Sequence, residues 1–426
     1  MDNILVSVII AAYNAEEYIR ECIESVLSQT LNNIEVIVVN DGSSDQTQKI
    51  IDEYKLKDPR VVCISQPNKG AAAARNRGLY IAKGKYVNFF DADDIMIDRF
   101  LERAYLKAEK DKSEVVVCQS NKFYERDIDN QSLLDQTINL KILNNLSLVK
   151  PLDISENLYQ CFMGWAWDKL FLTSFIKNNK IVFQEIRQSN DLFFTYYALS
   201  IAGKISLVLK PCVLHRYHYG SLENTKSVAP ECLYLSLLKL FEQLKNKRIF
   251  DYYAVTLFTL TVNLGLWYLA GLNEKDKNIE LYIKLFKQMR DSYSSFETDI
   301  KNKDLRNYFI YKLFTDKTCK VRFIKKIIEK DINNIIVYGV GSYGQFLLDT
   351  LLKTEVNIPF AIDQNRTEYK GISIKKMNYS EITGIKENNT IIVTVINKGD
   401  EIVKFLQANN SCRVLSFDDI VSCLFE

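Results

Sequence analysis

The feature that most constrains the fold is a series of short apolar segments, separated by helical stretches, near the N-terminus. Residues 4–12 read ILVSVIIAA, a continuous apolar run typical of a strand that is covered on both faces of a sheet. Three later segments, within IEVIVVN, RVVCISQ and KYVNFF, repeat this character, and the residues between them carry apolar side chains at helical spacing. Strands and helices that alternate in units of this size predict a parallel α/β sheet with right-handed connections.

Length and composition set the outer limits of the prediction. A chain of 426 residues is too long for one ordinary core, so we expect two or three domains. The hydrophobic fraction of 47% and the charged fraction of 25% are typical of a folded, soluble protein, and a net charge of +2 predicts no nucleic-acid partner. Nine cysteines without a CxxC pair favour a reducing compartment over a disulfide framework or a structural zinc site.

The chain divides into three predicted regions. Residues 1–228 form the first α/β region, and residues 229–330 are rich in Leu, Phe, Tyr and Lys at helical spacing. Residues 331–426 begin again with a strand, a glycine turn and a helix, which predicts a second, smaller α/β domain. The N-terminus lacks a basic flank followed by a cleavage site, so we expect no signal peptide and a cytoplasmic location.

Two segments of the middle region bear on membrane contact. Residues 252–273 contain no charged side chain and are long enough to cross a bilayer, but threonine, asparagine and glycine dilute the stretch. We therefore predict a buried or interface helix there. Residues 317–330 carry five lysines and Arg322, which form either a solvated basic face or a contact with anionic lipid headgroups. Contact with a membrane surface stays an open alternative.

Acidic residues gather where the fourth apolar segment ends. FFDADD places Asp91, Asp93 and Asp94 directly after it, and Tyr13 and Asp41 follow the first and second segments. Ligands of parallel α/β sheets bind beyond the carboxyl ends of the strands, so these residues mark a candidate site. Asp91 and Asp93 would repel each other if both were ionised, and a hard divalent cation, Mn²⁺ or Mg²⁺, resolves that repulsion. The alternative is that the carboxylates only cap a turn and a helix.

Six segments, taken in order, resemble the inverting family 2 glycosyltransferases, which have the glycosyltransferase A fold. They are VSVIIAAYNAEEYI, IEVIVVNDGSSDQT, NKGAAAARNRGL, FFDADD, WAWDKLF and SNDLFF. Each segment alone is a weak signal, but their order and spacing over residues 5–225 make the resemblance specific. By this resemblance residues 1–228 would be the catalytic domain, residues 229–330 a helical linker or interaction region, and residues 331–426 a Rossmann-like domain.

The resemblance implies a metal-dependent inverting glycosyltransferase that uses a nucleoside-diphosphate sugar, in particular a UDP-sugar. The acceptor would be a hydroxyl of a glycan or of a lipid-linked molecule in bacterial surface polysaccharide synthesis, such as capsule or cell-wall assembly. A peripheral position at the inner membrane face and a homo-oligomer are further expectations of this kind. Two alternatives stay open, namely a nucleotide-sugar-binding scaffold without transfer and an NAD-dependent enzyme that uses the C-terminal domain.

The resemblance also assigns roles in donor and metal binding. Asp93 is implied as a metal ligand, Asp91 as a contact shared between the metal and the ribose, and His218 as a further metal ligand. Asp94 is left as the cap of the following helix. The implied donor-binding residues are Ala11, Tyr13, Asp41, Arg75, Asp91, Arg216 and Ser221.

SNDLFF is implied to hold the general base. Inverting transfer needs one base within hydrogen-bond reach of the acceptor hydroxyl, and Asp191 supplies the carboxylate. Many members of the resembled family have a Glu-Asp pair here, whereas this chain has Asn190-Asp191, so the departure falls on the supporting position. We assign Trp167 and Asp168 of WAWDKLF, together with Asn190, to the acceptor side, and we expect Trp165 in the core.

The C-terminal domain contains a second candidate site. Gly339, Gly341 and Gly344 lie between a predicted strand and a predicted helix, and Asp363 ends the next strand. This is the context of a dinucleotide or nucleotide-sugar site. The unit is short, and a role in packing or assembly is the alternative.

Overall fold

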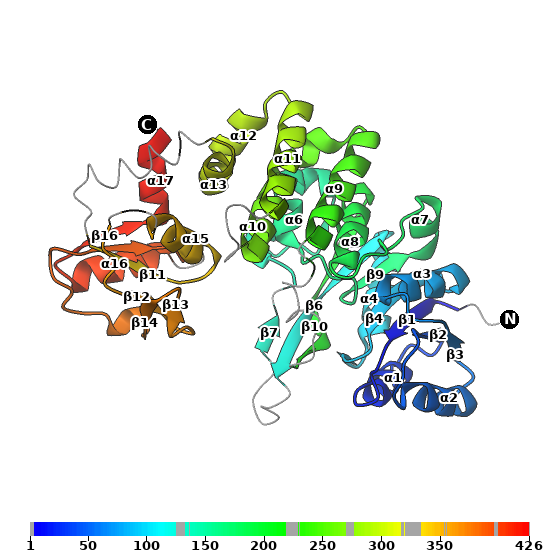
Figure 1. Ribbon diagram of the computed structural model, residues 1–426. Helices are drawn as coiled ribbons and strands as arrows, with labels where there is room; N and C mark the ends of the chain where they lie inside the picture. Colours follow the sequence, from blue (N-terminus) through cyan, green and yellow to red (C-terminus); the bar gives the residue numbers. More distant parts are fainter. Residues whose placement is uncertain are drawn as a thin grey trace. The chain divides into compact units, whose positions relative to one another are not determined.

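The computed structural model describes residues 4–124, 133–135, 137–218, 229, 231–269, 277–316, 319, 334–352, 354, 356–395 and 399–425. The chain forms two compact units, Met1–Leu257 and Phe258–Glu426. Each unit has its own sheet (Figure 1).

The sheet of the first unit has the strand order β3-β2-β1-β4-β9-β6-β10-β5. Its first four strands are parallel, and they are the four apolar segments that the sequence predicts, so the α/β class is confirmed. They are β1 (Val6–Ala12), β2 (Ile34–Asn40), β3 (Val61–Ser65) and β4 (Tyr86–Asp91).

The remainder of this sheet is mixed, which the expectation of a parallel sheet did not include. β9 (Lys169–Leu172) runs antiparallel between β4 and β6 (Val115–Tyr124), and β10 (Ile205–Tyr217) pairs with β6 in parallel. Three short strands pair antiparallel with β10 or β6, and they are β5 (Ile95–Met96), β7 (Leu133–Asp135) and β8 (Leu148–Val149). The antiparallel β9 therefore joins the parallel half of the sheet to the β6–β10 pair.

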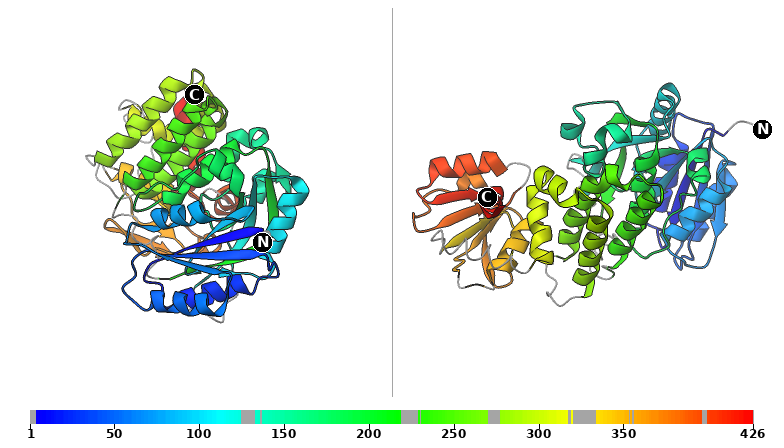
Figure 2. Two further views of the ribbon diagram at one scale, coloured as in Figure 1. Left: turned by 90° about the vertical axis from the view of Figure 1, so that its right-hand side faces the viewer. Right: turned by 90° about the horizontal axis from the view of Figure 1, so that it is seen from above.

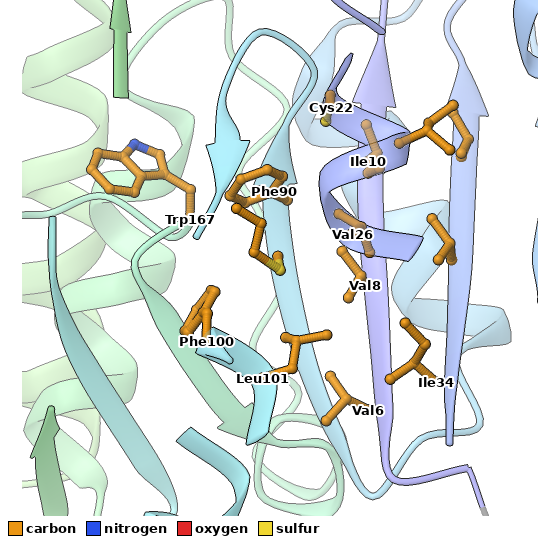
Figure 3. Close-up of a cluster of buried hydrophobic side chains, with 14 of the residues drawn as sticks. Val6, Val8, Ile10, Cys22, Val26, Ile34, Phe90, Phe100, Leu101 and Trp167 are labelled. Carbon is orange, nitrogen blue, oxygen red and sulfur yellow. The ribbon is translucent and has the colours of Figure 1, made fainter. Parts of the chain in front are cut away.

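Helices cover both faces of the first four strands (Figure 1). Helices α1 (Ile19–Leu27), α2 (Thr47–Lys57) and α4 (Phe100–Asp111) contribute to one core cluster with alternate residues of β1, such as Val8 and Ile10 (Figure 3). Helix α3 (Ala71–Ile81) lies on the opposite face. Its small side chains allow close approach to the sheet, because a Cβ on Gly78 would lie 3.2 Å from Ile9 Cγ1.

Helix α8 (Asn190–Ile201) is buried along nearly its whole length. Phe194 stacks on Phe183 with ring centroids 4.0 Å apart and lies edge-on to Phe89 of β4 at 5.1 Å. This aromatic contact fixes α8 against the strand that ends in the acidic cluster. The other helices of this part of the chain are α5 (Leu140–Leu143), η1 (Pro151–Asn157), α6 (Leu158–Cys161), α7 (Thr173–Asn178) and α9 (Glu231–Asn246).

Residues 252–269 of the uncharged stretch lie in α10 (Phe250–Leu269), and residues 270–273 fall outside the described residues. Polar side chains of α10 are hydrogen-bonded to other helices. Thr259 Oγ1 donates to Asp304 Oδ2 at 2.7 Å, and Asn263 Oδ1 accepts from Asn307 and from Tyr343. The second unit also contains α11 (Lys277–Ser292), α12 (Phe296–Lys303) and α13 (Leu305–Thr315). Among the described residues, no helix has both the length and the apolar character that a membrane crossing requires. The basic run at residues 317–330 falls outside the described residues, apart from Cys319.

The second sheet has the strand order β13-β14-β12-β11-β15-β16. All its strands are parallel except β13, which gives the order 3-2-1-4-5 of a doubly wound sheet plus one antiparallel edge strand. The predicted C-terminal α/β unit is therefore present, with helices on both faces of the sheet (Figure 2). Its elements are β11 (Ile335–Tyr338), α15 (Ser342–Leu351), β12 (Ala361–Asp363), β13 (Glu368–Tyr369), β14 (Ile372–Lys376), η3 (Tyr379–Glu381), β15 (Thr390–Val393), α16 (Gly399–Asn409), β16 (Arg413–Ser416) and α17 (Phe417–Phe425).

Gly84, two residues before β4, packs closely against β1. A substitution at this position therefore tests how tightly the start of β4 packs on β1. The Gly84 N–H donates to Ser7 Oγ at 2.8 Å, and an added Cβ would lie only 2.7 Å from both Ser7 Oγ and the Val6 carbonyl carbon. We expect Gly84→Ala to lower the free energy of unfolding by about 1–3 kcal/mol in urea denaturation, because the backbone of a buried central strand cannot move aside.

The control for this variant is Gly399→Ala. An added Cβ at Gly399 meets no atom within 4 Å, so the free energy of unfolding should stay within about 0.5 kcal/mol of the unchanged protein. Wild-type stability of Gly84→Ala would show that β4 is not held against β1 in this register.

Candidate functional site

The polar side chains predicted to form a site meet at the carboxyl ends of the parallel strands. Ala11 of β1 lies opposite Asp91 of β4 in the strand register, and Tyr13, just beyond β1, is 51% exposed. Asp41 directly follows β2. The end of β10 lies beside the aspartates, to which it is hydrogen-bonded. The topology thus brings together residues that are far apart in the sequence.

The three aspartates at the end of β4 and in the turn that follows it form the group of acidic residues that the sequence singles out. One carboxylate oxygen from each of Asp91, Asp93 and Asp94 lies within 4.8 Å of the others, a spacing that allows shared ligation of one cation. Asp94 differs from the other two because it is buried. Its carboxylate accepts from Arg216 N at 2.9 Å and lies 3.1 Å from His215 Nδ1.

These contacts correct the role expected for Asp94. Helix α4 begins at Phe100, and no side chain caps its N-terminus, so Asp94 is not its cap. Asp94 instead joins the turn after β4 to strand β10. Burial raises the pKa of Asp94 to about 6, although the nearby His215 opposes that shift.

Residues at the end of β10 fold back onto the acidic cluster. His218 Nε2 lies 2.9 Å from Asp93 Oδ2. Burial opposes ionisation of Asp93, but His218, together with a backbone hydrogen bond and the nearby His215, lowers the pKa of Asp93 overall. Arg216 donates from Nε to the Asp93 carbonyl oxygen and from Nη2 to Glu21. Its guanidinium lies over the ring of Tyr18, 5.0 Å from the centroid. Ser221, which the resemblance implies as a donor-binding residue, falls outside the described residues.

Arg75 connects the acidic cluster to helix α8. Its Nη2 donates to Asp91 Oδ1 at 2.6 Å, and its Nη1 donates to Asn190 Oδ1 at 2.8 Å. The buried Nε–H of Arg75 has no hydrogen-bond acceptor among the residues that the structure describes. Asn190 is the first residue of α8, so Arg75 fixes the start of this helix beside Asp91.

Asp191 lies in the first turn of α8, next to the Asn190 contact. Burial raises its pKa to about 6, Arg75 opposes the shift, and the negative charge of Asp91 adds to it. A carboxyl whose pKa lies near neutrality is suited to accept a proton during a reaction.

Asp41 is almost fully buried, and its carboxylate organises the loop after β3. Oδ1 accepts from Gln66 Nε2 at 2.7 Å and from Lys69 N at 2.9 Å, and Oδ2 accepts from Gly70 N at 2.7 Å. The loop that precedes α3 is therefore held by Asp41. A contact between Asp41 and a nucleotide base stays a prediction.

The burial of the two tryptophans in WAWDKLF is the reverse of the expectation. Trp167 is only 2% exposed and belongs to the core cluster drawn in Figure 3, whereas Trp165 is half-buried at the edge of this cluster. Asp168 is fully buried and pairs with Lys169 at 2.7 Å. Neither Trp167 nor Asp168, which directly precede β9, presents its side chain to solvent.

The C-terminal glycine turn is tightly packed. A Cβ on Gly344 would overlap the carbonyl oxygen of Gly339, so α15 starts directly against the turn that follows β11. The Asp363 carboxylate accepts from the backbone N–H groups of Val340, Asn365 and Arg366. These contacts hold the turn itself. Nucleotide binding at Gly339, Gly341, Gly344 and Asp363 stays a prediction.

Sequence reasoning did not identify two charged residues of this region. Glu21 binds Arg216, but it lies on a helix with no motif of its own. Lys169 is fully buried, and its ammonium donates to Asp168 Oδ1 and to the carbonyl oxygens of Met163 and Trp165. The adjacent Asp168-Lys169 pair on a strand with apolar neighbours was the available signal, because buried charges must be paired.

The N-terminal part of the chain is similar to proteins that are named glycosyltransferases. Residues 7–164 match the family described as Glycosyl transferase family 2. EpsH of Bacillus subtilis (strain 168) is 33% identical over 225 residues, which cover 52% of this chain and 63% of that protein. Glycosyltransferase GlyG of Streptococcus pneumoniae serotype 4 is 31% identical over 230 residues, which cover 52% of this chain and 74% of that protein. The chain thus spans less than two thirds of the length of EpsH.

Solved structures share this fold, and one of them serves as an example. The crystal structure of S. aureus TarS 1-349 in complex with UDP-GlcNAc aligns with a TM-score of 0.56 and 21% sequence identity. The alignment covers 76% of this chain and 92% of that chain. At this level of identity the likeness establishes the fold, in agreement with the class predicted from the six segments.

The raised pKa of Asp191 predicts that this residue weakens folding at neutral pH. The folded-state pKa of about 6 lies above the usual carboxyl value, so the ionisation penalty is absent below about pH 4 and complete above the folded pKa. Removing the ionisable group should therefore increase the free energy of unfolding most at high pH. We expect the stability of Asp191→Asn relative to wild type to rise by about 1–3 kcal/mol between about pH 4 and pH 8 in urea denaturation.

An exposed carboxyl gives the matched control for this measurement. Asp153 lies at the surface in η1, and Asp153→Asn should show the same pH dependence of stability as wild type. If Asp191→Asn also follows wild type at every pH, then Asp191 is solvated and not held in a buried environment.

Proposed function

Because the chain belongs to glycosyl transferase family 2, we propose that it is a metal-dependent inverting glycosyltransferase that uses a nucleoside-diphosphate sugar. The observation that carries this proposal is the Arg75 bridge. One guanidinium joins Asp91 of the acidic cluster to Asn190, beside the candidate base Asp191. A donor-side group and an acceptor-side group are therefore fixed next to each other, as a displacement reaction requires. Residues 1–228 would form the catalytic domain.

The donor is proposed to be a UDP-sugar. The TarS chain that shares this fold was crystallised with UDP-GlcNAc, which supports a donor of this class. Tyr13 offers an exposed ring on which a base can stack, next to Ala11 on β1 and the loop that Asp41 holds. Arg216 and Ser221 would contact the diphosphate. A phosphate oxygen would also satisfy the buried Nε–H of Arg75.

A divalent cation, Mn²⁺ or Mg²⁺, fits the acidic cluster. Asp91 and Asp93 supply hard carboxylate oxygens, and His218 lies close to Asp93, whereas the Asp94 carboxylate is already committed to His215 and β10. Asp91, Asp93 and His218 would therefore hold the ion. When bound, such an ion neutralises negative charge on the diphosphate leaving group.

Asp191 is the proposed general base of the transfer. Its carboxylate would accept the proton of the acceptor hydroxyl while the hydroxyl oxygen forms a bond to the anomeric carbon of the donor. The bond between the anomeric carbon and the phosphate oxygen breaks, and the electron pair leaves with the nucleoside diphosphate. Attack opposite the leaving group inverts the anomeric configuration.

The proposed acceptor is a hydroxyl of a glycan or a lipid-linked molecule in bacterial surface polysaccharide synthesis. A neutral hydroxyl must lose its proton during transfer, and the raised pKa of Asp191 suits this carboxylate to accept that proton. Transfer would take place in the cytoplasm, with the inner membrane face as a place of contact if the acceptor is lipid-linked. Homo-oligomer formation stays a prediction.

The central test is release of nucleoside diphosphate from a panel of UDP-sugars in the presence of Mn²⁺. We expect turnover with at least one donor, its loss on adding EDTA, and its recovery when Mn²⁺ is added in excess. UDP binding in isothermal titration should depend on the metal in the same way. A protein that neither binds UDP nor releases it from any donor contradicts the proposed function.

The pH profile tests the role of Asp191 separately. The base must be ionised to accept a proton, so kcat should rise with pH through a midpoint near the Asp191 pKa of about 6. Asp191→Asn should reduce kcat by about a hundredfold or more while UDP binding is retained. Asp153→Asn serves as the surface control. Near-normal turnover by Asp191→Asn would assign the base to another residue.

A further inference from the structure

The loop between α6 and β9 is fixed by hydrogen bonds from a buried cation. The Lys169 ammonium is fully buried and donates to the carbonyl oxygens of Met163 at 2.9 Å and Trp165 at 2.8 Å, and to Asp168 Oδ1 at 2.7 Å. An ammonium has three N–H donors, so this set uses all of them. Two loop carbonyls are thereby fixed in place, and the charge of Lys169 is paired inside the protein.

The same loop packs tightly on the helix that carries Asp191. Tyr196 lies on α8, and its hydroxyl donates to the Phe162 carbonyl oxygen at 3.2 Å. A Cβ on Gly164 would lie 2.9 Å from the Tyr196 ring, so glycine allows the loop to rest directly on that ring. The position of the loop is therefore set by α8 as well as by Lys169.

The aromatic face of the loop is connected to the acidic cluster. Trp165 stacks on buried Trp167 with ring centroids 5.1 Å apart, and its ring lies 5.6 Å from that of His215. His215 in turn contacts Asp94. Trp165 is only half-buried and Met163 is 41% exposed, so the loop presents an apolar and aromatic surface at this place.

We propose that Met163, Gly164 and Trp165 form an acceptor ledge on which a pyranose ring of the acceptor stacks against Trp165. Lys169 is its positioning residue. This inference rests on the proposed function, since it assigns the second substrate of that reaction. A sugar ring presents a C–H face that packs on an aromatic surface, while its hydroxyl groups remain available for hydrogen bonds. The ledge does not suit the anionic donor, because it offers no cation to pair with a diphosphate. The ammonium of Lys169 is buried and already paired inside the protein.

The test measures transfer by the full chain with Mn²⁺ and the UDP-sugar that supports turnover. Octyl β-glycosides of glucose, galactose, N-acetylglucosamine and N-acetylgalactosamine serve as acceptor probes. We expect Trp165→Ala to raise the acceptor KM about tenfold and to leave the donor KM unchanged, because stacking acts on the acceptor alone. Trp165→Phe, which keeps an aromatic face, should recover most of the loss.

A second variant, Lys169→Met, removes the cation but keeps the length of the side chain. It should also raise the acceptor KM and spare the donor KM, if its thermal unfolding shows that it folds. If it does not fold, the two Trp165 variants decide, because Trp165 is half-buried. The donor KM serves as the internal control, because an unchanged value shows that the donor-binding part of the site is intact in each variant.

Three outcomes for the variants would overturn the ledge. They are an unchanged acceptor KM in Trp165→Ala, an equal rise in donor and acceptor KM, and failure of Trp165→Phe to recover what alanine loses. A wild-type protein that releases UDP from its donor but does not respond to any octyl glycoside also overturns it. Absence of both UDP binding and UDP release contradicts the proposed function instead, so the two failures are distinguishable.

Discussion

The rest of the site depends on the buried guanidinium of Arg75. An unpaired buried cation costs several kcal/mol, so Arg75 can occupy its place on α3 only while Asp91 and Asn190 remain in contact with it. This requirement links three elements, α3, β4 and α8, which are distant in the sequence. It also places Asp191 within range of a positive charge, which limits the rise in its pKa. One interaction thus holds Asp91 of the acidic cluster next to the start of the helix that carries Asp191.

The hydrogen bond from Arg75 explains what a neutral side chain does at position 190. An asparagine accepts a hydrogen bond from Arg75 without adding charge, so the positive charge of Arg75 is shared between Asp91 and Asp191. A glutamate at position 190 would compete for that charge and would raise the pKa of Asp191 by repulsion. The departure from the Glu-Asp pair is therefore compatible with a working base, because the group that must ionise remains beside the cation.

The parts of the fold that follow local patterns could be predicted from the sequence. The buried parallel strands are continuous apolar runs, and the acidic residues follow β4 directly, so their place at the sheet edge was foreseeable. The antiparallel β9 was not, because its direction depends on the two strands between which it inserts. The burial of Trp165 and Trp167 was not foreseeable either, because their rings pack against His215, which is distant in the sequence. The partner of Asp94, His215, lies 121 residues away, beyond the reach of any local pattern.

Helix α8 shows how the site obtains its rigidity. Near one end of the helix, Asn190 is fixed by Arg75, while Tyr196 packs against the loop that carries Trp165. The rings of Phe194, Phe183 and Phe89 hold the middle of the helix on the sheet. A helix held on these sides cannot shift without breaking several buried contacts at once. Asp191 and the loop that carries Trp165 therefore keep a fixed separation, so a change in the packing of α8 would alter both the ionisation of Asp191 and the placement of Trp165.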